Sequence, residues 1–233
     1  TPKPSSAASD VYKRQRIRTW LKWLRNDTER WSFEEIRLLL AKRCENFIPN
    51  LSYSNEKNII RNKSIGFVHQ FFHLIPELTV LENVLLPNLI LNNQMKKSND
   101  LAKEIIVNCG LENRMYAKPT YLSGGEQQRV AIARALALKP KVLICDESLS
   151  MLDAEIQSEI LGLLNSLQQQ LGLAILFITH DLTVAASFCQ RIIVVDNGQI
   201  VEEGLSENVL KKPKANITKK IVRACPSLPI NSI

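Results

Sequence analysis

The hydrophobic pattern becomes regular from about residue 65 onward. Short apolar runs, typical of strands buried on both faces, occupy residues 65–69, 141–145, 173–179 and 191–196. Around them, apolar residues recur every three or four positions, which predicts helices over 79–86, 100–109, 123–138, 153–171 and 181–189. Strands that alternate with helices of this length predict βαβ units. We therefore expect an α/β fold, with a mostly parallel sheet and helices on both of its faces.

A tight hairpin is predicted near the end of this region. The run 191–196 is followed by Asn197-Gly198 and a second short run, 199–201. Asn-Gly readily adopts the left-handed conformations that a two-residue hairpin turn requires. These two runs are therefore expected to pair as antiparallel strands. Residues 206–233, which follow them, are expected to form a helical tail.

The first 64 residues differ from the rest in pattern and composition. Apolar residues recur there at helical spacing between residues 16 and 43, which predicts two short amphipathic helices with Lys and Arg on the opposite face. The residues that carry this pattern are Ile17, Trp20, Leu21, Leu24, Phe33, Ile36, Leu39 and Leu40. Residues 1–65 hold 14 Lys and Arg against 7 Asp and Glu, an excess equal to the net charge of the whole chain, +7. All three Trp lie in this stretch, whereas all eight Gly lie at or after Gly66.

A basic amphipathic segment has several interpretations. It is compatible with an arm that binds a membrane surface or nucleic acid. It is also compatible with a solvated helix face or a junction of no selected function, which we favour. Residues 5–15 resemble a translated adapter sequence of the kind found at the start of truncated, assembled reading frames. We therefore treat residues 1–64 as a separate, irregular segment and expect the natural N-terminus to be missing.

Cysteine usage and hydropathy narrow the class of protein. The five Cys are odd in number, far apart and without a Cys-x-x-Cys pair. This usage indicates reduced thiols in a cytosolic protein, and neither a disulfide framework nor a zinc site. No apolar run approaches the roughly 18 residues that a membrane-spanning helix needs, so we expect no such helix.

Charged or titratable side chains come directly after two of the predicted strands. The run 141–145 leads into Asp146 and Glu147, and the run 173–179 is followed by His180. Two carboxylates at the end of a buried strand are costly unless they bind a cation, activate a nucleophile or cap the next helix. Since one helix separates the two strands, a right-handed crossover would place them side by side or nearly so. The His180 imidazole is then a candidate to hold a charged ligand beside the carboxylates.

A second candidate site lies at the start of the helix predicted over 123–138. Ser123 is a good N-cap, and Glu126, three residues further on, completes a capping-box pattern. Gly124 and Gly125 leave backbone N–H groups uncovered, and the helix dipole adds positive potential there. An ordinary capped helix does not need two glycines, because glycine lowers helix stability. We therefore interpret this turn as a phosphate-binding site.

Five motifs along the chain resemble those of ATP-binding-cassette (ABC) ATPases. In chain order they are the Q-loop (67–70), the signature motif (122–129), the Walker B strand (143–147), the D-loop (150–153) and the switch histidine (179–181). They follow the family's order across about 115 residues, and the resemblance covers residues 61–205. It implies a P-loop NTPase-like fold with an additional α-helical subdomain that carries the signature motif.

The resemblance also implies roles for the residues after the strands. Asp146 would hold Mg²⁺ through its water shell, and Gln70 would contact the metal and the attacking water. Glu147 would polarise that water as the general base. His180 would contact the γ-phosphate and stabilise the charge that develops in the transition state.

A further set of roles depends on a second subunit, because this family closes its sites at a head-to-tail dimer interface. Ser123, Gly124 and Gly125, with Glu126 beside them, would bind the γ-phosphate of ATP held by the partner. Asp153 would communicate across the interface.

One element of the family's pattern has no counterpart in this sequence. The phosphate-binding P-loop, Gly-x₄-Gly-Lys-Ser/Thr, requires glycines, and none precedes Gly66. The N-terminal β-subdomain and the aromatic residue that stacks on adenine are likewise not identifiable. We thus expect residues 65–205 to be a partial nucleotide-binding domain between the segment 1–64 and the tail 206–233. Either a truncated gene product or a degenerate subunit would explain the missing P-loop, and we favour truncation. The chain alone is expected to be inactive.

The resemblance implies an ATP-hydrolysing subunit at the cytoplasmic face of the membrane. It would use ATP and Mg²⁺ and work with a second nucleotide-binding subunit and with integral membrane permease subunits. Residues 188–202 and 216–222 resemble peptide and nickel importer ATPases, whereas residues 70–84 resemble lipoprotein-release and macrolide-export ATPases. We favour the peptide or nickel type, because it rests on more of the chain.

Two other classes stay open as alternatives. One is a degenerate, non-catalytic subunit. The other is a DNA-maintenance cassette ATPase, which shares the signature motif and the switch histidine. Proteins of that class separate their nucleotide-binding halves by long coiled coils, and no sustained heptads occur here, so no nucleic-acid partner is expected.

Overall fold

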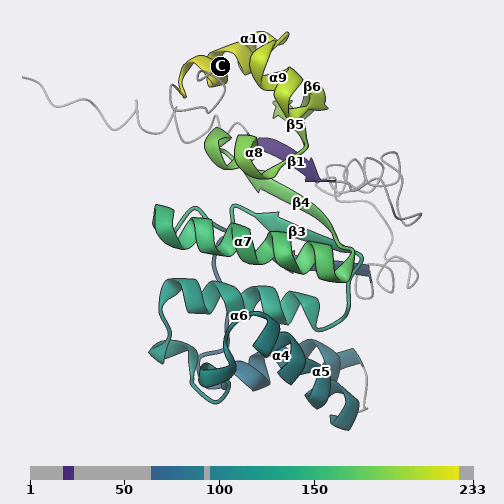
Figure 1. Ribbon diagram of the computed structural model, residues 1–233, viewed down its shortest axis with the longest axis vertical. Helices are drawn as coiled ribbons and strands as arrows, with labels where there is room; N and C mark the ends of the chain where they lie inside the picture. The colour runs from purple at the N-terminus through teal and green to yellow at the C-terminus, as the bar shows by residue number, and fades with distance from the viewer. Residues whose placement is uncertain (1–17, 24–63, 92–94, 226–233) are drawn as a thin grey trace, which may run out of the picture. The chain divides into compact units, whose positions relative to one another are not determined.

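The structure is a computed structural model that describes residues 18–23, 64–91 and 95–225. The chain divides into two compact units, one of residues 23–177 and the other of residues 1–22 and 178–233. Their helices and strands are labelled in Figure 1.

The unit of residues 23–177 combines parallel strands with a group of helices. Its strands are β2 (Ile65–Val68), β3 (Val142–Asp146) and the first part of β4 (Ala174–Thr179). β2 and β3 run parallel, with Val68 opposite Cys145, and β3 neighbours β4. The helices are α4 (Val80–Leu91), α5 (Met95–Asn108), α6 (Gly124–Leu136) and α7 (Ala154–Leu171), with the 3-10 turns η1 (Glu112–Arg114) and η2 (Pro119–Tyr121).

Helix α6 lies at the centre of this unit's packing. Helices α4, α5 and α6 pack on one another, and α6 also packs on β2 and α7 (Figure 1). The first four residues of β3 are all buried, as expected of a strand covered on both faces. The core includes Leu143 of β3, Ile132 of α6 and Ile160 of α7, all fully buried. The predicted α/β fold, with parallel strands and a helical group that carries residues 122–129, is confirmed.

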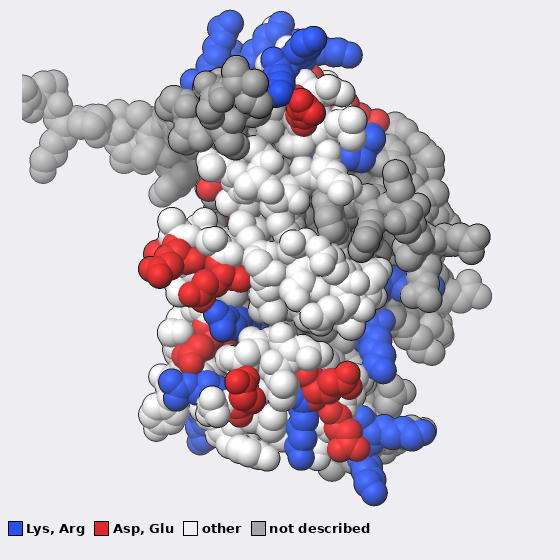
Figure 2. All heavy atoms as spheres, viewed as in Figure 1, with Lys and Arg blue, Asp and Glu red and all other residues white. Residues whose placement is uncertain are grey.

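The other unit is built on an antiparallel hairpin. Strand β5 (Arg191–Asp196) pairs with β6 (Gln199–Leu205), and β1 (Arg18–Trp23) pairs with β5 on its other side. Asn197 and Gly198 both have positive φ, 48° and 80°, which confirms the predicted hairpin turn. Helices α8 (Leu182–Phe188), α9 (Ser206–Lys211) and α10 (Asn216–Arg223) complete the unit. Lys and Arg side chains gather over α9 and α10 (Figure 2).

The prediction of a helix around residues 17–24 is wrong. Residues Arg18–Trp23 form strand β1, with Thr19 opposite Val194 and Leu21 opposite Ile192. Helical spacing is a weak signal over so short a segment, because such a helix is marginal without packing. Thr and Trp favour strands, and pairing with β5 satisfies backbone hydrogen bonds. The second helix predicted before residue 43 lies outside the described residues.

Two helices extend beyond their predicted bounds. Helix α5 begins at Met95, and α4 continues past Pro87 to Leu91. A proline inside a helix removes one backbone hydrogen bond, so the pattern predicts an end before it. Tertiary contacts keep α4 intact: the buried Asn88 donates from Nδ2 to the Ala137 carbonyl at 2.8 Å.

The cysteines that the structure describes are free thiols, as predicted. Cys109, Cys145 and Cys189 are buried, and Cys225 is partly exposed. Burial raises the pKa of both Cys109 and Cys145 to about 12. Within the same described ranges, no helix is both long enough and apolar enough to cross a bilayer.

Candidate functional site

The two carboxylates after β3 lie at the carboxyl end of a buried parallel strand. Asp146 is the last residue of β3, and Glu147 follows it with φ +48°; both are half-buried. A left-handed conformation costs a non-glycine residue on the order of 1 kcal/mol, and such strain concentrates at functional positions. Ser150 fixes the turn, because its backbone N–H and its Oγ both donate to the Glu147 carbonyl, at 3.1 and 2.8 Å.

The next helix does not use these carboxylates as its cap. Helix α7 is capped by Asp153, whose side chain accepts the Ile156 N–H at 2.9 Å. The alternative that Asp146 or Glu147 caps this helix is therefore wrong. That they bind a cation or activate a nucleophile stays a prediction. Asp153 thus has a structural role within its own chain, and its role toward a second subunit stays a prediction.

Gln70 leaves the sheet at the same edge as the carboxylates. It comes two residues after the end of β2, and β2 lies parallel to β3 with Val68 opposite Cys145. Parallel neighbours have their carboxyl ends at one edge of the sheet. The structure therefore brings Gln70, Asp146 and Glu147 to one edge within a single unit.

His180 directly follows β4 and is exposed. Strand β4 is the neighbour of β3, which confirms the adjacency predicted from a single crossover helix. His180 itself belongs to the other unit, where Asp181 caps α8 by accepting the N–H groups of Thr183 and Val184, at 2.7 and 3.4 Å.

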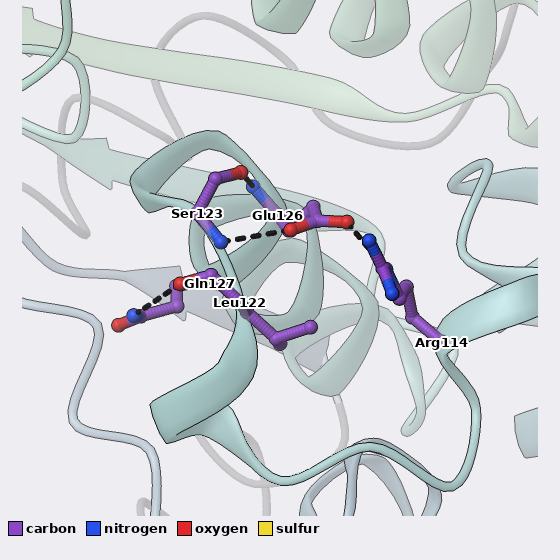
Figure 3. A network of polar contacts seen from close by, with 5 residues as sticks. All are labelled: Arg114, Leu122, Ser123, Glu126 and Gln127. Atoms are coloured by element: carbon purple, nitrogen blue, oxygen red, sulfur yellow. Dashed lines mark hydrogen bonds and ion pairs between the residues drawn. The ribbon is translucent and has the colours of Figure 1, made fainter.

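The capping box predicted at the start of α6 is confirmed (Figure 3). Ser123 Oγ accepts the Glu126 N–H at 3.2 Å, and Glu126 Oε2 accepts the Ser123 N–H at 2.8 Å. Glu126 Oε1 accepts from Arg114 Nε, also at 2.8 Å. The Ser123 N–H, and after it Arg114, hold the pKa of the Glu126 carboxyl below its usual value, against the opposing effect of partial burial. Both carboxylate oxygens are thus engaged within the chain, and a direct contact of Glu126 with a nucleotide stays a prediction.

The two glycines of this turn have different environments. Gly124 is exposed, and a Cβ added there would meet Leu152 Cδ2 at an ordinary 3.5 Å. Gly125 is buried, and its added Cβ would lie 2.7 Å from Ile156 Cγ2 on α7. Close packing of α6 on α7 therefore favours glycine at position 125. This is a structural reason for Gly125 that the sequence pattern did not reveal, and the role of this turn in phosphate binding stays a prediction. The N–H groups of both residues still lack partners within the helix.

Two side chains that the sequence pattern does not reveal shape the loop after β2. Arg134, in the last turn of α6, donates from Nη2 to the Phe72 carbonyl at 2.7 Å and from Nη1 to the His73 carbonyl at 2.6 Å. Burial lowers the pKa of Arg134. The fully buried Asn83 bonds the backbone of residues 75–79, through both its amide oxygen and its amide nitrogen. The loop is therefore held at two points.

Sequence comparison places the chain beside ABC proteins. Residues 40–150 match the family model described as ABC transporter. The methionine import ATP-binding protein MetN 2 of Enterococcus faecalis is 41% identical over 176 residues, which make up 76% of this chain and 50% of that protein. MetN 2 of Bacillus licheniformis is 44% identical over 161 residues, 69% of this chain and 47% of that protein. The chain thus spans about half the length of the curated relatives that it matches.

Comparison with solved structures also finds ABC transporter proteins. The dimeric structure of MJ0796, a bacterial ABC transporter cassette, matches with a TM-score of 0.58 and 38% identity, over 66% of this chain and 68% of that chain. CbiO1 from Clostridium perfringens, part of the ABC transporter complex cbiONQ, matches with a TM-score of 0.66 over 91% of this chain and 94% of that chain. At 22% identity, this second likeness shows the fold alone. From the family match, the sequence identities and the MJ0796 cassette together, we conclude that the chain belongs to the ABC transporter family, as one of its ATPase cassettes.

Proposed function

We propose that this chain provides two parts of an ATP-hydrolysing subunit in an ABC importer. One is the sheet edge that activates water, and the other is the signature motif at the start of α6. One observation carries the proposal: Gln70, Asp146 and Glu147 lie at the same edge of the sheet, at the carboxyl ends of neighbouring parallel strands. The capped, glycine-containing first turn of α6 belongs to the same unit. An acidic strand end suits activation of water, and a helix N-terminus with open N–H groups suits a phosphate.

Glu147 is the general base of the proposed reaction. Its backbone is fixed by the turn to Ser150, and its carboxylate would accept the proton of the attacking water. Gln70, from the neighbouring strand end, would orient that water. His180, after β4, would donate to the γ-phosphate as negative charge builds up on it.

The donor set at this edge fits Mg²⁺. Asp146 offers a carboxylate and Gln70 an amide oxygen, and Mg²⁺ typically takes one or two such protein ligands beside water and phosphate oxygens. Among the residues that the structure describes, no cluster of three or more His, Cys, Asp or Glu could hold a metal ion. Bound with ATP, Mg²⁺ would neutralise phosphate charge.

The first turn of α6 would serve ATP held by a second subunit. The N–H groups of Gly124 and Gly125 and the hydroxyl hydrogen of Ser123 are its available donors. We propose that two such cassettes work with permease subunits, at the cytoplasmic face of a membrane. Paired cassettes and permease subunits are both part of ABC transporters, the family that this chain matches, and the MJ0796 cassette is named as dimeric. These two facts support the proposed arrangement.

For the transported solute we propose methionine or a closely related amino acid. The relatives from Enterococcus faecalis, Bacillus licheniformis and Bacillus subtilis, 41–44% identical, are all named as methionine importers. The peptide or nickel substrate predicted from residues 188–202 has no support among them.

The chain by itself is expected to bind ATP weakly, because the loop that cradles a triphosphate needs glycine and none precedes Gly66. Calorimetric titration of the purified chain with MgATP should give no heat of binding in the micromolar range. Micromolar affinity would contradict this expectation.

A chimera tests the proposed function. Residues 65–205 of this chain replace the matching segment of Enterococcus faecalis MetN 2, and ATP hydrolysis and methionine uptake are measured. Glu147→Gln should reduce hydrolysis by roughly 10²–10⁴-fold. The matched control Glu155→Gln, an exposed carboxylate in the first turn of α7, should leave hydrolysis unchanged.

Two results would contradict separate parts of the proposal. If the chimera hydrolyses ATP equally well with Glu147→Gln and Glu155→Gln, Glu147 is not the base. If it hydrolyses ATP but supports no methionine uptake, the importer type is wrong.

A further inference from the structure

Glu126 brings a negative charge to the turn where a phosphate is proposed to bind. Its Oε2 accepts the Ser123 N–H at 2.8 Å and so completes the capping box. A glutamine would also complete the capping box, without a charge, because an amide oxygen also accepts a hydrogen bond. A carboxylate close to a bound phosphate weakens binding through like-charge repulsion. The turn can therefore accept an anion readily only if this charge is compensated.

Arg114 is placed to compensate it. Arg114 is the last residue of η1, and its Nε donates to the second carboxylate oxygen, Glu126 Oε1, at 2.8 Å (Figure 3). One oxygen of the carboxylate thus holds the turn, and the other holds the cation. The Arg114 side chain is 53% exposed and the Glu126 side chain 24%, so solvent screens part of their attraction, and the effect of the pair should be largest at low ionic strength.

The segment that follows Arg114 is fixed to helix α4. The carbonyls of Met115 and Ala117 accept the N–H groups of Leu81 and Val80, at 3.0 and 2.9 Å. These donors belong to the first turn of α4, whose N–H groups have no partner within their own helix. The backbone next to Arg114 is therefore anchored, and its side chain reaches Glu126 from a fixed position.

We propose that Arg114 is a positioning residue for the first turn of α6: it neutralises the Glu126 carboxylate and holds it on the Ser123 N–H, so that the turn can accept a phosphate anion. Arg114 itself contacts Glu126, not the anion. The inference rests on the proposed function, because the anion is the terminal phosphate of a nucleotide held by a second subunit.

Triphosphate binding to the purified 233-residue chain tests the inference. Sodium triphosphate is titrated at low ionic strength, and the amide resonances of Gly124 and Gly125 are followed in the ¹⁵N-labelled chain. Arg114→Ala should weaken the apparent affinity by roughly three- to tenfold, since it leaves one uncompensated carboxylate near the anion. Adding Glu126→Gln to Arg114→Ala should restore the affinity to within about twofold of wild type, because no charge is then left to neutralise.

Two control variants separate pairing from general effects. Arg114→Lys keeps the positive charge and should stay within about twofold of wild type. Lys118→Ala removes one positive charge from the same segment, where Lys118 interacts with Glu82. It should also stay within about twofold.

The outcomes distinguish the inference from the proposed function. If the Gly124 and Gly125 resonances of the wild-type chain do not respond to triphosphate, the proposed phosphate site fails, and the role of Arg114 fails with it. If they respond, but Arg114→Ala binds as tightly as wild type, the inference alone is overturned. It is also overturned if the double variant stays as weak as the single one, since a merely structural defect would not be rescued by Glu126→Gln, or if Lys118→Ala is as weak as Arg114→Ala.

Discussion

Alanine substitutions at Gly124 and Gly125, adjacent positions of one helix turn, should change the free energy of unfolding in opposite directions. At position 125 the new Cβ would lie 2.7 Å from Ile156 Cγ2, closer than real Cβ contacts come. Overpacking of this kind typically costs about 1–3 kcal/mol, whereas alanine in place of a helical glycine contributes about 0.5–1 kcal/mol of stability. We therefore expect Gly125→Ala to destabilise the chain by up to roughly 2.5 kcal/mol.

Gly124→Ala serves as the matched comparison. Its Cβ would meet Leu152 Cδ2 at 3.5 Å, which is ordinary van der Waals contact. The helix-propensity gain then has no packing cost against it, so this variant should be as stable as wild type or more stable by up to about 1 kcal/mol. Urea unfolding followed by far-UV circular dichroism measures both variants.

A double-mutant cycle identifies the neighbour responsible. Ile156→Ala removes Cγ2 and opens the space that the Cβ of Gly125→Ala needs, so the two substitutions should be coupled by about 1 kcal/mol or more. Equal stability of Gly124→Ala and Gly125→Ala would refute the packing argument, and so would additive effects of Gly125→Ala and Ile156→Ala. An open backbone for an anion would then again be the reason for the second glycine.

Three further results are expected. Arg134→Lys keeps the charge but loses the guanidinium fork that bonds two carbonyls. Amide hydrogen exchange in residues 71–79 should then become roughly tenfold faster, while exchange in β3 stays unchanged. Equal acceleration in β3 would indicate global destabilisation instead. Because the pKa of Glu126 is lowered in the folded chain from a usual value of 4.5, its ionised form stabilises the fold above that value, and this contribution is lost as the pH falls through the lower, folded pKa. Urea midpoints of wild type and Glu126→Gln should therefore converge on acidification, and a constant difference would contradict the linkage. Iodoacetamide at mildly alkaline pH should label Cys225 and spare Cys145, which is buried with a pKa of about 12; mass spectrometry of the native chain checks this, and labelling of native Cys145 would contradict its burial.

Features that depend on neighbouring residues could be predicted from the sequence. The apolar run 141–145 becomes β3, Asn197-Gly198 forms the hairpin turn, and Ser123 with Glu126 forms the capping box. In each case the pattern and the interaction lie within a few residues of one another. The acidic strand end could be located for the same reason, because its position follows from where an apolar run stops.

Features that depend on distant partners could not be predicted. Arg134 bonds a carbonyl 62 positions away and Arg114 bonds a carboxylate 12 positions away, and no local pattern encodes either contact. A helix was predicted where strand β1 lies, because the conformation of this segment depends on pairing with β5, far along the chain. The need for glycine at position 125 is set by Ile156 on another helix, which periodicity alone does not place.

The two attachments of α6 make its residue count matter. Near one end Glu126 holds Arg114, and near the other Arg134 holds the loop after β2. Inserting or deleting one residue between them would turn one end by about 100° and shift it by about 1.5 Å relative to the other. Both sets of partners could not then be kept. The length of this 13-residue helix is therefore fixed by the contacts at its two ends. Related cassettes should differ in α6 by substitutions, and their insertions and deletions should lie in the connections outside it.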